Sequence, residues 1–99
     1  MPTYVLMTRL KPGELKDATA RAESGREWLE RVNKACPEVK WIAHFALLGP
    51  YDFMDIYEAS DVETAHKVSM ISRAAGALTA ESWEALPYDR YLELMSEIT

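Results

Sequence analysis

Hydrophobic and polar residues follow two different periods along this chain. Runs that are rich in β-branched and aromatic residues, or that alternate in polarity, predict strands. The predicted strands are residues 3–9, 39–48, 53–59 and, more weakly, 77–86. The second and third are separated by Gly49, Pro50, Tyr51 and Asp52, which is the composition of a tight turn. These two strands are therefore expected to form an antiparallel hairpin.

In three other segments, apolar residues recur every three to four positions, which predicts three amphipathic helices. The first covers residues 17–36, and the third begins at Pro87. A capping box that opens at Ser60 starts the second, which ends before Gly76. We expect Gly25, on the apolar stripe of the first helix, to allow close packing on the sheet. The inner face of the second helix carries Ala65, Val68, Ile71 and Ala75, and one face of the third carries Tyr88, Tyr91, Leu92 and Met95.

The predicted element order is β-α-β-β-α-β followed by a C-terminal helix. This is the order of the split βαβ, or ferredoxin-like, plait, an α+β fold with an antiparallel sheet and two helices on one face. The length of 99 residues fits a single domain over residues 1–99. Such a plait leaves the second face of its sheet uncovered. Whatever covers that face is expected to decide the biology.

A tight turn would pair Leu48 with Phe53 and His44 with Tyr57, and would place Asp55 diagonally to His44. The face expected under the helices carries Val39, Trp41, Ala43, Phe45, Leu47, Met54 and Ile56. The open face is then mixed, with Lys40, Ile42, His44, Ala46, Leu48, Phe53, Asp55 and Tyr57. We expect a second subunit to cover its apolar area, which would make a dimeric α+β barrel with an interior cavity. A three-residue loop would instead move His44 to the face of Met54 and Ile56.

The hairpin also carries a family resemblance. Gly49, Tyr51, Asp52 and Phe53 form the pattern G-x-Y-D-F, and the chain opens with Met-Pro-Thr-Tyr-Val-Leu. In these residues, and in length and element order, the chain resembles the GYD domain family. The resemblance implies a small ferredoxin-like domain that forms dimeric α+β barrels, and it implies no established activity. Asp55 departs from the aliphatic residues that such strands usually carry.

Charge and composition narrow the possible partners. The formal net charge is −5 and the pI is near 5.0, so the chain lacks the basic surface that binds nucleic acid. No apolar run approaches the ~20 residues of a membrane span, and the first residues do not resemble a signal peptide. We therefore predict a cytoplasmic protein with no membrane partner. The single cysteine, Cys36, is expected to be a small buried apolar residue.

The sharpest candidates for chemistry are His44, Asp55 and Tyr57. Imidazole exchanges protons near neutral pH, and a neighbouring carboxylate fixes its tautomer, so His44 could act as a general base with Asp55 as its orienter and Tyr57 as a hydrogen-bond donor. The alternative is that these polar groups satisfy one another in a dimer interface. Neither histidine has further ligands at a spacing that indicates a metal site, and no cofactor motif is present.

The turn itself supplies candidate ligand-binding residues. Tyr51, Asp52 and Phe53 could line the mouth of a pocket, because loops on a rigid scaffold often carry binding groups. The alternative is local, with Asp52 accepting hydrogen bonds from backbone N–H groups of the turn.

Two functions remain open at this point. The first is a homodimeric module that binds a small organic ligand or serves regulation or assembly. The second is a cofactor-independent oxygenase or isomerase that acts on a small organic substrate through His44. The second rests on analogy of fold.

Overall fold

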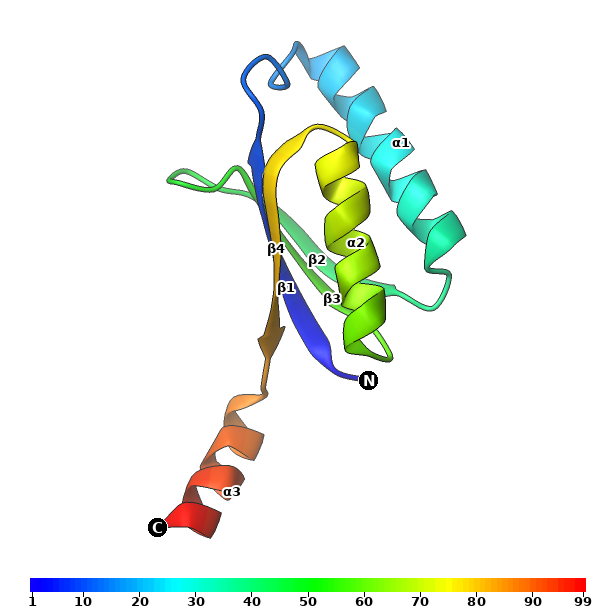
Figure 1. The fold of residues 1–99 in the computed structure, drawn as a ribbon. Helices are drawn as coiled ribbons and strands as arrows, with labels where there is room; N and C mark the ends of the chain where they lie inside the picture. The colour runs from blue at the N-terminus through cyan, green and yellow to red at the C-terminus, as the bar shows by residue number, and fades with distance from the viewer.

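The computed structural model describes residues 1–99 and shows an antiparallel sheet flanked by helices (Figure 1). The elements are β1 (Thr3–Leu10), α1 (Ala18–Ala35), β2 (Lys40–Ala46), β3 (Phe53–Glu58), α2 (Val62–Ala74), β4 (Ala77–Ala85) and α3 (Tyr88–Ile98). This order confirms the predicted α+β, ferredoxin-like fold with a C-terminal helix. No helix is both long enough and apolar enough to cross a membrane.

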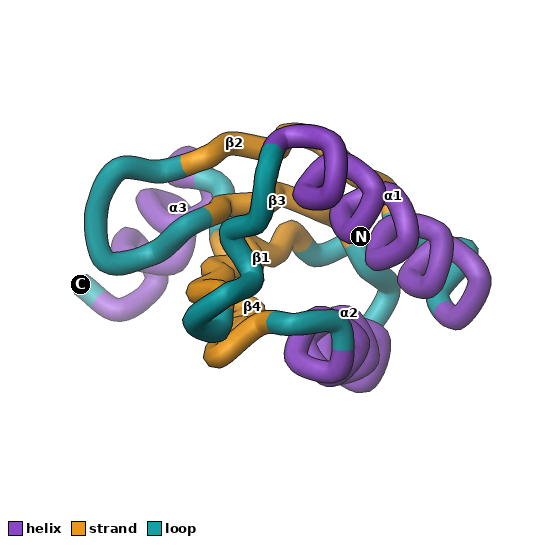
Figure 2. Tube along the Cα trace, turned by 90° about the horizontal axis from the view of Figure 1, so that it is seen from above, coloured by secondary structure: helices purple, strands orange, loops and turns teal.

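The four strands lie in the order β2-β3-β1-β4, and all neighbours are antiparallel. The helices α1 and α2 cover one face of this sheet, whereas α3 lies on the other side (Figure 2). We call the face beneath α1 and α2 the helix face, and the other the open face. The core fills the helix face, where Leu6 and Tyr57 of the sheet and Val32 and Val68 of the helices are completely buried. Burial of these apolar side chains is the main stabilising term of the fold.

Two aspartates determine where the long helices begin. The Asp17 carboxylate accepts a hydrogen bond from the Ala20 N–H at 2.9 Å, and the Asp61 carboxylate accepts one from the Thr64 N–H at 2.8 Å. The latter bond lowers the pKa of Asp61. The prediction that Ser60 caps α2 is wrong, because its hydroxyl donates to Glu38 at 3.1 Å.

The end of α2 agrees with the prediction. Its C-cap is Ala75, and Gly76 follows with a φ of +112°. Only glycine adopts this left-handed conformation without strain, which explains its position after the helix.

The predicted register of the hairpin is wrong by two residues. Phe53 pairs with Ala46, and Asp55 pairs with His44. The cause is Asp52, whose N–H donates to the Thr8 carbonyl at 2.8 Å and whose carboxylate accepts from the Leu10 N–H at 2.7 Å. These bonds tie Asp52 to β1, so that residues 47–52 form a loop wider than the expected turn.

The prediction of which face lies under the helices is right for Val39 and Trp41 and wrong for the rest of the hairpin, from Ala43 onward. Asp55 and Tyr57 belong to the helix face, whereas the apolar residues of the hairpin tip lie on the open face. A bulge at Ile42 contributes to this arrangement, because the pairing skips one residue between Trp41 and Ala43 and brings Trp41 to the same face as His44. The apolar residues left on the open face are Val5, Met7, Ala43, Phe45, Met54, Ile56 and Trp83.

A polar helix face is tolerated because its polar atoms find partners. The Tyr57 hydroxyl and the Ser82 hydroxyl are 2.7 Å apart, and Ser82 also lies 2.9 Å from the Ser69 hydroxyl. Buried hydroxyl groups that are hydrogen-bonded in this way do not carry the penalty of unsatisfied ones. The count of apolar side chains alone therefore does not identify the buried face here.

Candidate functional site

A pocket of about 720 Å³ lies beneath α1, between this helix and the sheet. Its volume falls in the range of ~300–1,000 Å³ that is typical of small-molecule sites. The pocket exists because α1 packs against α2 and makes no backbone contact with the strands. It occupies the helix face and is therefore distinct from the cavity predicted between two subunits on the open face, which stays a prediction.

Gly25 opens the α1 side of this pocket. A Cβ built on Gly25 meets no atom within 4 Å, so the expectation that it packs closely on the sheet is wrong. Trp28, one turn further along, keeps the helix at a distance from the strands. Its ring lies 5.2 Å from that of Trp41, and its indole N–H donates to the Ser72 hydroxyl at 2.8 Å. Both indoles line the pocket.

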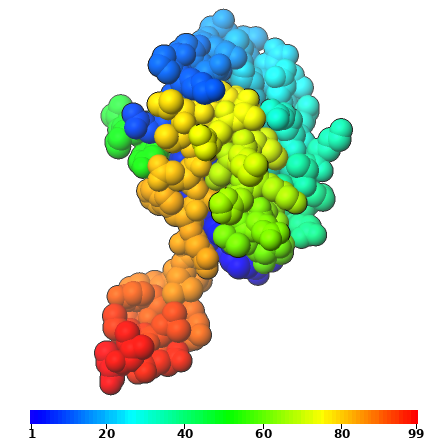
Figure 3. All heavy atoms as spheres, viewed as in Figure 1, coloured from blue at the N-terminus to red at the C-terminus, as the bar shows by residue number.

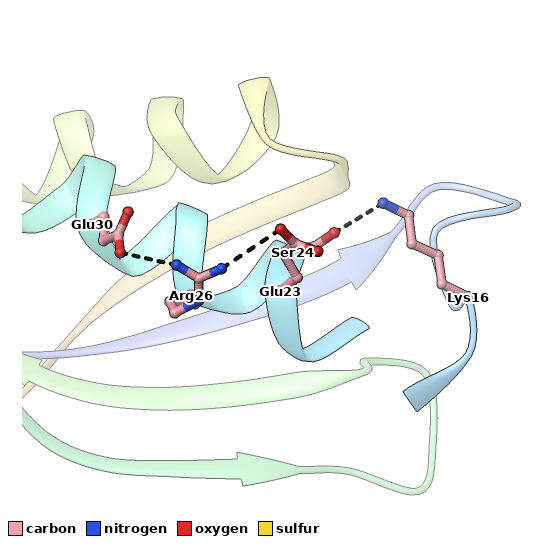
Figure 4. A network of polar contacts seen from close by, with 5 residues as sticks. All are labelled: Lys16, Glu23, Ser24, Arg26 and Glu30. Atoms are coloured by element: carbon pink, nitrogen blue, oxygen red, sulfur yellow. Dashed lines mark hydrogen bonds and ion pairs between the residues drawn. The ribbon is translucent and has the colours of Figure 1, made fainter. Parts of the chain in front are cut away.

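The outward side of α1 is a solvated network of charges. Arg26, at the pocket rim, pairs with Glu23 at 3.6 Å and with Glu30 at 3.4 Å, and Lys16 donates to the Ser24 hydroxyl at 2.9 Å (Figure 4). Exposed pairs of this kind contribute little to stability. Their relevance here is that the Arg26 charge is already engaged by two carboxylates.

Arg21 is the second cation of the pocket and points toward the strands. Its guanidinium lies 5.8 Å from the centre of the Phe53 ring, and one of its N–H groups donates to the Glu14 carbonyl at 2.9 Å. The same wall continues from Phe53 to His44, and the rings of these two residues are stacked 5.7 Å apart. Arg21, Phe53 and His44 therefore form a continuous wall with a positive end, suited to a planar or anionic group.

His44 and Asp55 are in direct contact across β2 and β3. The Nδ1 atom of His44 hydrogen-bonds to the Oδ1 atom of Asp55, as the paired register requires. The Asp55 residue is only 4% exposed, whereas the His44 side chain is 63% exposed. Burial raises the pKa of the Asp55 carboxyl, and the neighbouring His44 opposes this shift.

This contact determines what the pair can do chemically. With Asp55 ionised, its carboxylate holds the proton on Nδ1 and leaves the Nε2 lone pair of His44 free. An imidazole held in this tautomer can accept a hydrogen bond or a proton from a molecule in the pocket. Of the predicted catalytic residues, the structure thus brings His44 and Asp55 together.

Tyr57, the third predicted catalytic residue, lies away from this pair. Its ring is fully buried between Tyr4 and Trp41, at centroid distances of 5.5 and 5.3 Å, and its hydroxyl contacts Ser82. Burial raises the pKa of Tyr57 to about 12. Tyr57 thus lies in the core and does not line the pocket.

The three predicted ligand-binding residues separate in space. Phe53 lines the pocket, whereas Tyr51 and Asp52 do not. The Tyr51 hydroxyl donates to Glu81 at 3.2 Å on the open face, and its ring meets the edge of Trp83 at 6.0 Å. Asp52 has the local role described above, as a bridge from the hairpin to β1.

The sequence reasoning missed several residues that line the pocket. Two are polar and buried, Thr8 on β1 and Ser72 on α2. Both residues could have been predicted from the sequence. Each is a hydroxyl residue on the side of its strand or helix whose apolar residues point inward. Arg21 and Trp28 had no signal in the sequence, since a helix with this many charges is typical of a solvated face.

Comparisons with known proteins agree with the fold and with the G-x-Y-D-F pattern of the hairpin. The family model of the GYD domain matches residues 4–95 of this chain. A protein of Thermus thermophilus named "glutamine synthetase and cystathionine beta-lyase binding protein" is 28% identical over 90 residues, which cover 88% of this chain and 90% of that protein.

Solved structures agree with this architecture. The crystal structure of a protein from Thermus thermophilus superposes with a TM-score of 0.54 at 18% identity, covering 88% of this chain and 95% of its own. A hypothetical protein from Pyrococcus horikoshii superposes with a TM-score of 0.52 at 19% identity, covering 88% and 92%. At these identities the likeness concerns the fold alone.

Proposed function

The chain belongs to the GYD domain family, and we propose that it is a homodimeric binding module with regulatory function, which takes a small organic ligand in the pocket beneath α1. The observation that carries this proposal is the pocket itself, a cavity of about 720 Å³ with aromatic walls and a histidine–aspartate pair. Apolar walls with a few convergent polar groups are typical of ligand sites. The homodimer is supported by the apolar open face.

The named relative favours binding over catalysis as the primary role. That protein is named for binding two enzymes, glutamine synthetase and cystathionine beta-lyase. By analogy, we propose that this chain also contacts a protein partner and that occupation of the pocket changes this contact. The specific enzymes are not carried over, since the identity is 28%.

Native mass spectrometry tests the ligand site. The protein as purified is expected to carry a reproducible mass in excess of its denatured mass. Gly25→Trp places an indole in the pocket and should remove that mass, because the glycine has open space before it. Glu27→Trp, on the exposed side of the same helix, is the matched control and should retain it. A wild-type protein without extra mass, or a Gly25→Trp variant that still carries it, would contradict the ligand site.

A second function is favoured by one specific observation, the contact between His44 and Asp55. With Nε2 free, this pair could remove a proton from a bound substrate without a cofactor, as an isomerase or oxygenase requires. The molecule released from the denatured protein should then exchange a C–H proton for deuterium in D₂O when wild-type protein is added. His44→Ala should abolish the exchange, and exchange that persists in His44→Ala would exclude this mechanism.

A further inference from the structure

The pocket beneath α1 contains one cation that no carboxylate of the chain neutralises. Arg21 takes part in none of the ion pairs, and its guanidinium donates only to the backbone carbonyl of Glu14, at 2.9 Å. The Glu14 carboxylate is engaged by Lys16 at 3.4 Å. Arg26, the other arginine of the pocket, already pairs with two carboxylates of α1 (Figure 4). In a chain with a net charge of −5, Arg21 is thus a free cation beside a cavity.

The sheet beneath Arg21 suits a planar anion. Thr8 pairs with Phe53 across β1 and β3, so these two side chains are neighbours on the helix face. Thr8 lines the pocket and is 8% exposed, and its hydroxyl group can donate a hydrogen bond to an anion held by Arg21. A guanidinium binds a carboxylate through two parallel N–H groups, which an ammonium group does not match. This end of the pocket therefore favours a carboxylate.

Away from Arg21 the pocket is lined by two indoles. Trp41 pairs with Tyr57, which lies four residues beyond Phe53 on β3, or roughly 13 Å at about 3.3 Å per residue. On α1, Trp28 follows Arg21 by seven residues, or roughly 10 Å at about 1.5 Å per residue. The helix and the sheet thus give similar lengths between the cation and the indoles. A single aromatic ring with a carboxylate is too short to contact both, whereas two fused rings are long enough.

The middle of the pocket disfavours a second anionic group. The hydrogen-bonded pair of His44 and Asp55 lies there, between Phe53 and Trp41 along the strands. Asp55 is the only acidic residue that lines the pocket, and it is 4% exposed. Its carboxylate would repel a second negative charge, and no unpaired cation lies beside it to compensate. The pocket is therefore matched to one anionic group, at the Arg21 end.

We propose that the ligand of this pocket is an aromatic monocarboxylate with two fused rings, with its carboxylate bound by Arg21 and its rings between Phe53 and the two indoles. This deepens the proposed function and rests on its ligand site. No residue of α3 lines the pocket, and Figure 3 shows this helix apart from the rest of the molecule. The C-terminal helix therefore takes no part in the site.

Isothermal titration calorimetry with β-naphthoate and β-naphthamide tests the requirement for charge, because the two probes share their rings and differ in charge. The acid should bind the wild-type protein at least ~10-fold more tightly than the amide, since only the acid forms charge-assisted hydrogen bonds with Arg21. The corresponding naphthalene dicarboxylate, with its second acid group on the distal ring, should bind more weakly than β-naphthoate. Arg21→Gln should abolish the preference for the acid. Arg26→Gln removes a cation of the same pocket that is already paired, and this matched control should retain the preference.

Nuclear magnetic resonance of the tryptophan indole N–H groups locates the bound probe. Trp28 and Trp41 line the pocket, whereas Trp83 lies on the open face of the sheet. The signal of Trp83 is identified by its loss in Trp83→Phe. Addition of β-naphthoate should shift the other two indole signals and leave that of Trp83 in place.

The outcomes separate the class of ligand from the ligand site. Equal affinity for the acid and the amide would overturn the proposed class, as would a loss of preference in Arg26→Gln as large as that in Arg21→Gln. Indole signals of Trp28 and Trp41 that do not shift would also overturn it. In each case the ligand site of the proposed function still stands if the purified protein carries extra mass that Gly25→Trp removes. Without that mass, the site fails whatever the charge of the ligand.

Discussion

Replacing Gly25 by alanine is expected to stabilise the protein. Gly25 lies inside α1 with no positive φ, and a Cβ at this position meets no atom within 4 Å. The new methyl group therefore creates no clash and reduces the conformational freedom of the unfolded chain. In a helix interior, alanine is favoured over glycine by about 0.5–1 kcal/mol. In a domain of this size, that gain should raise Tm by roughly 2–8 °C.

Urea unfolding followed by tryptophan fluorescence measures the effect on the free energy of unfolding. The midpoint should increase for Gly25→Ala with an unchanged slope, since the surface exposed on unfolding is the same. Glu27→Gly, on the exposed side of the same helix, is the control and should lower stability by a comparable amount. A Gly25→Ala variant less stable than wild type would refute the reasoning, because it would mean that α1 packs closely on the sheet at this position and that the pocket is closed.

Four further substitutions test the site and its surroundings. Burial raises the pKa of Asp55, so the native state binds more protons than the unfolded state just above the ordinary pKa of an aspartate, and wild-type stability falls as pH rises through that window. Asp55→Asn should therefore gain stability relative to wild type as pH rises above about 4. A difference in stability that stays constant with pH in urea titrations would contradict this. Tyr57→Phe removes the contact with Ser82 and should cost ~1 kcal/mol without changing ligand mass, whereas loss of that mass would place Tyr57 in the site. Asp61→Ala should lower Tm more than Ser60→Ala, and the reverse order would restore Ser60 as the cap.

The sequence predicted the elements and their order because local pattern determines them. Strand and helix periods, Gly76 after α2 and Pro87 before α3 are all local signals. The hairpin register was not local. It depends on the hydrogen bonds of Asp52 to Thr8 and Leu10, two residues that lie at least 42 positions away in the chain. The composition of residues 49–52 alone therefore does not predict these hydrogen bonds.

The same limit applies to the candidate site. The pairing of His44 with Asp55 was within reach, because a register shift of two residues keeps both on one face. The face itself was assigned wrongly, since the count of apolar residues outweighed the partners that Ser82 and Ser69 supply to Tyr57. The pocket could not be predicted at all. It depends on the Trp28–Trp41 contact, which holds α1 away from the sheet.

Most residues of the hairpin lie on the face opposite to the predicted one, and this changes the role that we expect of the helix face and of the open face. If a second subunit covered the face of His44 and Asp55, both side chains would lie in a dimer interface. Their hydrogen bond to each other would then be enough to explain why these polar residues are there. On the helix face they border a cavity instead, and burial of the Asp55 carboxylate is tolerated because it is hydrogen-bonded to His44. The face that remains open is correspondingly free of such groups near Phe45 and Ile56, which suits permanent burial against a partner. Ligand binding and self-association can therefore be changed by mutation independently, because they occupy opposite faces of one sheet.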